Sequence, residues 1–189
     1  MADVKNEIAA ADRLLKSRQE TYDKANELAR DIVRSSGIAI ARMHNTSAAG
    51  PSLSRIKAMV ERLKSMELSN SNIKLQALQE YSEAAIFKEI KRSGSVPPMG
   101  ALGVGEQAYL LGLMDAIGEL KREVFESLNR GDLKLAEKYT AIMANDYDAS
   151  RQIRYQDSIL PGFRRKQDAA RIMLESCMSE LLYFKLHSK

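Results

Sequence analysis

Apolar residues recur at the spacing of an α-helix along most of the chain. In the first part they include Ile8, Leu15, Tyr22 and Ile32, with no Pro or Gly before Gly37. This spacing predicts one long helix over residues 3–43. At ~1.5 Å per residue the helix would extend for ~60 Å, which exceeds the width of a compact domain of this size. Its length therefore indicates a partner along the helix, either in a hairpin or in another copy of the chain.

Turn-forming residues divide the rest of the chain into shorter helices. Residues 45–51 are predicted to form a turn, residues 69–72 a break and residues 93–100 a loop, because Gly, Pro, Ser and Asn collect there. Pro161 and Gly162 mark another break. The predicted helices cover residues 53–67, 72–92, 105–129, 133–149 and 162–186, with Ser52 or Ser54 capping the first and Asp132 the fourth. The segment 150–160 is also predicted to be helical.

No segment alternates strictly between apolar and polar residues, so no sheet is predicted. The fold class expected is all-α, one domain over residues 1–189, built as a bundle of about six to seven helices. The composition agrees, since 44% of residues are hydrophobic and Gly and Pro number only 10 and 4.

Charge and cysteine content limit the setting of the protein. The net charge of +4 permits an anionic partner without requiring one. Cys177 is the sole cysteine, so no intrachain disulfide can form, and we expect it to be a core residue of a cytoplasmic protein. No apolar run approaches the ~20 residues that span a membrane, and the N-terminal segment has no features of a signal peptide.

Two pairs of carboxylates are placed unusually for a helical bundle. Glu80 and Glu83 are three residues apart and lie ~60° apart around their helix, so they share a face. Asp115 and Glu119 are four residues apart in an otherwise uncharged stretch. Burial there removes the hydration of a carboxylate, which costs free energy unless a cation compensates the charge. Each pair has an ordinary interpretation, as a solvated face or as partners of Lys and Arg. Periodicity also leaves Glu126 as a rival, at ~20° from Asp115.

The scarcity of histidine bears on the kind of metal that such carboxylates would bind. His44 and His187 are the only histidines, and both are predicted to lie on the surface. Neither forms the Glu-x-x-His unit of di-iron bundles. An all-oxygen site favours Mg²⁺, with Mn²⁺ as the second choice, and suits phosphodiester hydrolysis. The neighbouring Lys88, Lys91 and Arg122 are predicted to hold phosphates, although each could be an ordinary surface charge.

Three stretches carry a resemblance to the translin family, which contains translin and translin-associated factor X. They are Leu28-Ala-Arg-Asp-Ile-Val-Arg34, Leu78-Gln-Glu-Tyr-Ser-Glu-Ala84 and Tyr109-Leu-Leu-Gly-Leu-Met-Asp-Ala-Ile-Gly-Glu-Leu-Lys-Arg122. The third stretch is long and specific, and the resemblance extends over nearly the whole chain. The loop 93–104 is shorter than in factor X, as in a compact, prokaryotic or archaeal type of member.

The resemblance implies a bundle of about seven helices that assembles into a closed, hollow homo-octamer. It also implies that Glu80, Glu83, Asp115 and Glu119 are the catalytic and metal-binding set of a Mg²⁺-dependent endoribonuclease acting on single-stranded RNA. The alternative is a non-catalytic protein that binds single-stranded RNA or single-stranded DNA, as translin itself does. A third interpretation is a structural bundle whose carboxylates are all paired with Lys or Arg.

Overall fold

The computed structural model describes residues 3–45, 52–66 and 72–187. Every regular element within these ranges is a helix, so the all-α prediction is confirmed. The predicted turn at 45–51 and break at 69–72 lie almost entirely outside the described residues. The helices are α1 (Val4–His44), α2 (Leu53–Lys64), α3 (Asn72–Ser93), α4 (Met99–Leu102), α5 (Glu106–Asn129), α6 (Leu133–Ser150) and α7 (Phe163–His187).

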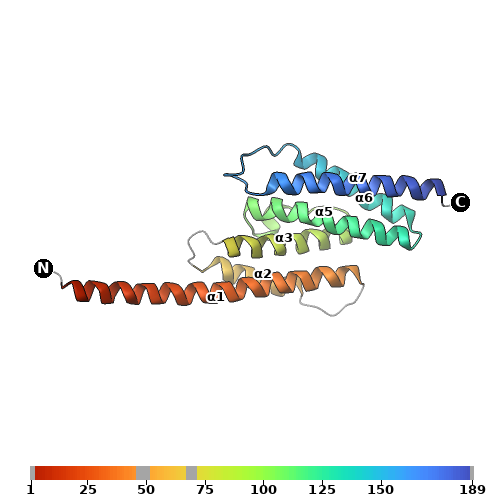
Figure 1. The fold of residues 1–189 in the computed structure, drawn as a ribbon. Helices are drawn as coiled ribbons and strands as arrows, with labels where there is room; N and C mark the ends of the chain where they lie inside the picture. Colours follow the sequence, from red (N-terminus) through yellow and green to blue (C-terminus); the bar gives the residue numbers. More distant parts are fainter. Residues whose placement is uncertain (1–2, 46–51, 67–71, 188–189) are drawn as a thin grey trace.

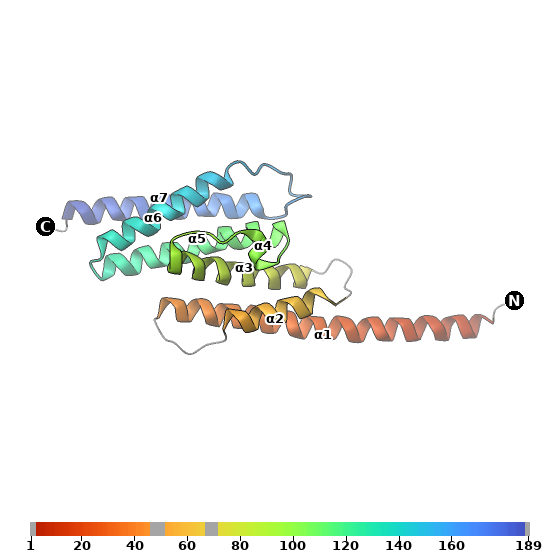
Figure 2. The ribbon, with the colours of Figure 1, turned by 180° about the vertical axis from the view of Figure 1, so that it is seen from behind.

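The long helices lie side by side in the order α1, α3, α5 and α7, with α2 beside α1 and α6 beside α5 and α7 (Figures 1 and 2). The helix pair α3 and α5 forms the centre of the bundle. Phe87 from α3 and Ile117 and Leu120 from α5 are fully buried there. Cys177 is buried in α7 as predicted, and no described helix is long and apolar enough to cross a membrane.

The first half of α1 projects beyond the rest of the bundle (Figure 1). The first buried side chain of α1 is that of Ala25, which packs in the core where the helix meets α3. Residues 4–20 are exposed except for the half-buried Ala10. The prediction of one long N-terminal helix is therefore confirmed, and among the described residues the first half of that helix contributes no buried side chain to the core.

The prediction that residues 150–160 are helical is wrong. α6 ends at Ser150, and turns and extended backbone connect it to α7. The side chain of Gln167 donates a hydrogen bond of 2.8 Å to the Ser150 carbonyl, which satisfies an end group of α6. At the other end of the connection, Gly162 adopts a φ of 77°, and its N–H donates to the Asp157 carboxylate at 2.8 Å. These tertiary contacts leave no trace in the periodicity.

Gly112 allows α3 and α5 to approach each other closely. A Cβ atom at this position would lie 2.7 Å from the Ser82 Cβ, 2.8 Å from the Gln79 carbonyl oxygen and 2.8 Å from the Glu83 nitrogen. Two of these three atoms belong to the backbone of α3, which cannot move aside without moving the helix. Gly112, one of the two Gly residues in the Tyr109–Arg122 motif, is thus required by packing.

We expect Gly112→Ala to be destabilising, because the new methyl group would force α3 and α5 apart. Gly118→Ala in the same helix is the matched control, since its Cβ would meet only the tip of Met173, at 3.6 Å. Both changes gain the same helix propensity, so the Gly112 variant should unfold with ~1–3 kcal/mol less free energy than the Gly118 variant. Urea denaturation measures this difference, and equal stabilities would contradict the packing role.

Candidate functional site

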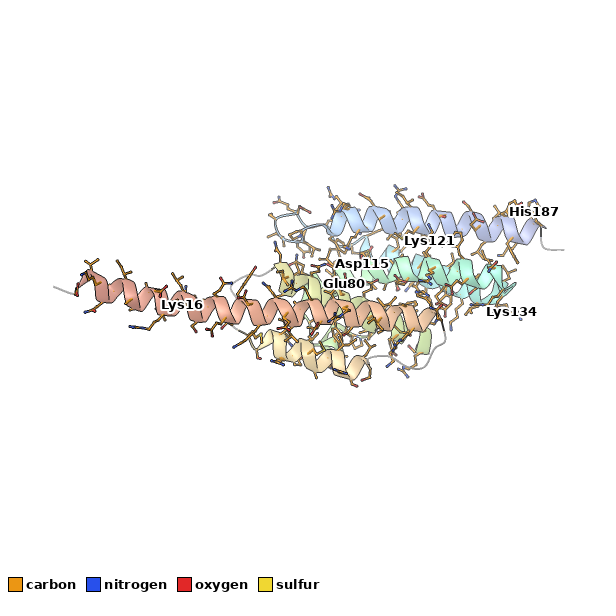
Figure 3. The ribbon with its side chains drawn as sticks, turned by 60° about the horizontal axis from the view of Figure 1, so that its bottom comes forward. Lys16, Glu80, Asp115, Lys121, Lys134 and His187 are labelled. Carbon is orange, nitrogen blue, oxygen red and sulfur yellow. The ribbon has the colours of Figure 1, made fainter. Side chains whose placement is uncertain are left out.

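All four predicted carboxylates line a single cleft of about 350 Å³ between α3, α5 and the first turns of α7. Glu80 and Glu83 come from α3, and Asp115 and Glu119 come from α5. Figure 3 shows Glu80 and Asp115 close together where these two helices meet. The remaining lining residues are Gln79, Met114, Gly118, Lys166, Ala169 and Met173.

The two glutamates of α3 are held in an environment that opposes their charge. Burial, followed by the charges of Asp115, Glu80 and Glu119, raises the pKa of Glu83 to about 8. Burial and the nearby Asp115 also raise the pKa of Glu80, although Lys166 acts in the opposite direction. Within the described part of the chain, neither glutamate forms a hydrogen bond or an ion pair. Their ionised forms therefore lack a compensating partner.

Asp115 is paired. Its Oδ1 accepts a hydrogen bond from Lys166 Nζ at 2.5 Å, and its Oδ2 accepts one from the Gln79 amide at 2.7 Å. Lys166 comes from the start of α7, so three helices meet at this carboxylate. The charge of Lys166 also acts against the rise in the pKa values of Glu80 and Glu83, but burial and the neighbouring carboxylates outweigh it.

The prediction that His44 is a surface residue is wrong. His44 is 5% exposed and lies at the end of α1, beside the ring of Phe87. Its Nε2 lies 2.5 Å from Glu119 Oε2, and its Nδ1 lies 2.6 Å from Glu123 Oε1. When both carboxylates are ionised their oxygens only accept, and His44 can then donate to both as the imidazolium ion. His187, by contrast, is exposed as predicted.

Glu123 belongs to a second network behind the cleft. Its Oε1 also accepts from Lys91 Nζ at 2.8 Å, and the same ammonium donates to the Met43 carbonyl. Burial lowers the pKa of His44, but the hydrogen bonds to Glu119 and Glu123 outweigh it, and the net pKa is raised. For Glu123, burial is outweighed in the same way by His44 and Lys91, and its pKa is lowered. This network fixes the end of α1 to α3 and α5.

The ligand atoms of the four carboxylates do not converge on one point. Among the described residues, the potential ligand atoms that lie within 4.8 Å of one another belong to His44, Glu123 and Glu126. Lys91 already donates to Glu123, and Arg122 and Arg130 are paired with Glu126, so cations occupy that group. Glu126, which periodicity left open, does not line the cleft.

The three basic residues predicted to hold phosphates do not line the cleft either. Lys91 is partly buried in the Glu123 network, Arg122 is paired with Glu126 at 2.9 Å, and Lys88 is exposed on α3. The structure places Lys166 in the cleft instead. Sequence reasoning missed Lys166, Gln79 and His44, since each reaches its carboxylate from 36 to 75 residues away along the chain.

No family model matches the chain. An uncharacterized protein of Methanocaldococcus jannaschii is 27% identical over 176 residues, which cover 90% of this chain and 79% of that protein. Among solved structures, AfC3PO superposes with a TM-score of 0.82 at 24% identity and covers 95% of this chain and 97% of its own.

Two further solved structures are similar. A complex of AfC3PO with duplex RNA has a TM-score of 0.78 at 23% identity, and covers 95% of this chain and 97% of its own. Apo-NeC3PO has a TM-score of 0.68 at 20% identity, and covers 97% of this chain and 98% of its own. C3PO is an assembly of the translin type. The chain has the translin-type fold. The resemblance indicated by the sequence motifs is thus confirmed at the level of the fold.

The raised pKa of Glu83 makes stability depend on pH. The folded protein retains a proton on Glu83 up to about pH 8, whereas the unfolded chain releases it near the ordinary glutamate pKa of 4.5. The stability gained from this proton is complete below pH 4.5 and is lost as the pH rises through 8. In EDTA, Glu83→Gln should therefore be more stable than the parent at about pH 9, by on the order of 2–3 kcal/mol.

The measurement is urea denaturation of both proteins between about pH 5 and pH 9, where the parent should lose stability more steeply than the Glu83→Gln variant. Parallel curves for the two proteins would show that Glu83 is ionised throughout and that the carboxylates are compensated by other groups.

Proposed function

We propose that this chain is a metal-dependent endoribonuclease that cleaves single-stranded RNA at the carboxylate cleft. The observation that carries the proposal is the meeting of Glu80, Glu83, Asp115 and Glu119 around one cleft, where two of the four have no cationic partner among the described residues. A cluster of this kind is costly unless a cation enters it. The resemblance to factor X selects the same four residues.

The donor set fits Mg²⁺ or Mn²⁺, since all four side chains offer oxygen ligands. Glu80 and Glu83 face the cleft without hydrogen bonds within the described residues. Asp115 would exchange Lys166 for the metal, and Glu119 would be oriented by its bond to His44. When bound, the metal supplies charge neutralisation at the phosphate and a water of lowered pKa.

The protein's own side chains then have separate tasks. Gln79 holds Asp115 Oδ2 and so fixes the orientation of that carboxylate. Lys166 stays within the cleft, where an ammonium released from Asp115 can bind a phosphate oxygen. A carboxylate of the cleft that makes no direct bond to the metal can accept a proton from the attacking water during hydrolysis.

RNA as the substrate class is supported by a protein of the same fold, since AfC3PO has been solved with duplex RNA. A second candidate function is RNA binding without cleavage. It is favoured by the pairing of two of the four carboxylates, Asp115 with Lys166 and Glu119 with His44. Such pairing suits a protein that binds RNA without cutting it. Binding that persists unchanged in EDTA, together with no cleavage in Mg²⁺, distinguishes this alternative.

We expect Glu80→Gln and Asp115→Asn to lower the rate of RNA cleavage on the order of 100-fold or more, because each removes a charged ligand from the cleft. The assay follows a labelled single-stranded RNA in Mg²⁺, with EDTA as the metal-free reference and duplex RNA as a second substrate. Circular dichroism and size-exclusion chromatography establish that each variant keeps its fold and assembly.

Glu126→Gln is the matched control, since Glu126 lies on α5 outside the cleft. It should cut at the parent rate. Cleavage by Asp115→Asn at the parent rate would contradict the site assignment. Cleavage of duplex RNA as fast as single-stranded RNA would contradict the proposed preference for single strands.

We propose further that the chain assembles into a closed homo-octamer, partly through the projecting half of α1. Ile8, Leu15 and Tyr22 follow one another at intervals of seven residues, and all three are exposed, at 64%, 62% and 44%. Apolar residues at this interval form one stripe along a helix, which is the pattern of helices that pack lengthwise. A second exposed apolar surface lies on α7, with Met178, Leu182 and Leu186.

We expect the double change Ile8→Glu and Leu15→Glu to reduce the assembled mass, because it places charges in the stripe. Light scattering coupled to size-exclusion chromatography measures the mass. Lys16→Glu is the control, since Lys16 is exposed and lies outside the stripe (Figure 3). An unchanged mass for the double variant would show that α1 is not an assembly surface.

A further inference from the structure

A second hollow of about 740 Å³ adjoins the carboxylate cleft. The two share Gln79 and Lys166 as lining residues, so they meet where Lys166 bonds to Asp115. The first turns of α3 and α5 and the start of α7 form the walls of this hollow, hereafter the basic groove. A chain molecule lying in the cleft can therefore continue directly into the basic groove.

The charge of the basic groove is opposite to that of the cleft. Lys74, Arg165 and Lys166 line it, and none of the described residues lining it is acidic. Lys74 donates to the Lys64 carbonyl at 3.2 Å, and Lys166 is bound to Asp115. The guanidinium of Arg165 is exposed and forms no hydrogen bond or ion pair within the described residues. Arg165 is thus the group best placed to bind a phosphate in two-point fashion.

The remaining walls of the basic groove suit a nucleobase. Leu75, Leu78 and Pro161 supply apolar surface, and Leu111 is buried beneath them. The amides of Gln76 and Gln107 offer both donors and acceptors. Apolar surface packs against the face of a base, and amides bond to its edges, so the groove carries the elements that recognise an unpaired nucleotide. A polyanion without bases would contact only the basic side chains of the groove.

We propose that the basic groove holds the nucleotide adjoining the scissile phosphate, with Arg165 bound to that nucleotide's phosphate. This inference rests on the proposed cleavage of RNA at the carboxylates. It gives the two hollows separate tasks, since the cleft contains four carboxylates that repel RNA and the groove contains the attractive charge. Bases that are paired in a duplex are not free to enter such a groove, and the groove therefore accounts for a preference for single strands.

The test measures binding apart from cleavage. A labelled single-stranded RNA of about 12 nucleotides is titrated with the full chain in EDTA, and fluorescence anisotropy is read over a series of salt concentrations. Arg165→Ala should weaken binding about tenfold and reduce the slope of log K against log salt by about 0.7. Gln107→Glu should also weaken binding, because it adds a negative charge to the groove, and a carboxylate in the first turn of α5 does not disturb the helix.

Arg164→Ala is the matched control, since Arg164 is the adjacent exposed arginine of α7 and does not line the basic groove. Equal weakening by the Arg164 and Arg165 variants would show that only general surface charge acts, and would overturn the proposal. An abasic oligonucleotide of the same length should bind more weakly than RNA, and equal affinity would overturn the assignment of a nucleotide.

The cleavage assay separates failure of this inference from failure of the proposed function. In Mg²⁺, Arg165→Ala should raise KM with little change in kcat, because the lost interaction lies outside the reacting centre. A parent chain that binds RNA through Arg165 but does not cut it would refute the nuclease and leave the groove as a binding site. A parent chain that cuts RNA, with Arg165→Ala unchanged in both Kd and KM, would refute the groove alone.

Discussion

The contact between α3 and α5 at Gly112 is the constraint on which the candidate site depends. At this point the backbone of α3 approaches so closely that a Cβ on α5 would lie 2.8 Å from the Gln79 carbonyl oxygen. Glu80 and Glu83 follow on one side of the contact, and Asp115 lies one turn beyond it on the other. A wider spacing would separate the two carboxylate pairs and open the space between them to water, which would screen their repulsion. The close contact therefore sets both the geometry of the cleft and the raised pKa values within it.

Two basic side chains hold this acidic cluster together from opposite sides. Lys166 on α7 binds Asp115, and His44 at the end of α1 binds Glu119, so the outer helices are tied to the central pair through charged hydrogen bonds. Glu80 and Glu83 are left without such bonds among the described residues. A purely structural cluster would gain by pairing all four carboxylates, because each unpaired buried charge costs free energy. Under the proposed function, a cation would supply the missing compensation, and in its absence the proton retained on Glu83 reduces the repulsion.

The sequence was sufficient to predict the helices and the two carboxylate pairs, but not the side chains that bond to those carboxylates. Helical periodicity gives the face on which Glu80 or Asp115 lies, and the family resemblance selected these residues over Glu126. Periodicity does not give the register between helices, and that register alone brings Gln79, Lys166 and His44 to the carboxylates. His44 was misplaced for this reason, since nothing near it in the sequence indicates two acidic partners. The segment 150–160 was misassigned because Gln167, from the next helix, takes the last carbonyl of α6.

The acidic cleft and the basic groove meet at Lys166, so the position proposed for RNA binding adjoins the one proposed for cleavage. The carboxylates of the cleft disfavour a polyanion, so under the proposed function the affinity for RNA would come from elsewhere on the surface. Lys91 and Arg122, which the sequence suggested for this role, are already paired with Glu123 and Glu126 and stand outside the cleft. The cations of the basic groove adjoin the cleft and share one lysine with it. Under the proposed function, a strand anchored there would bring its next phosphate to the carboxylates, so attraction at one position would offset repulsion at the other.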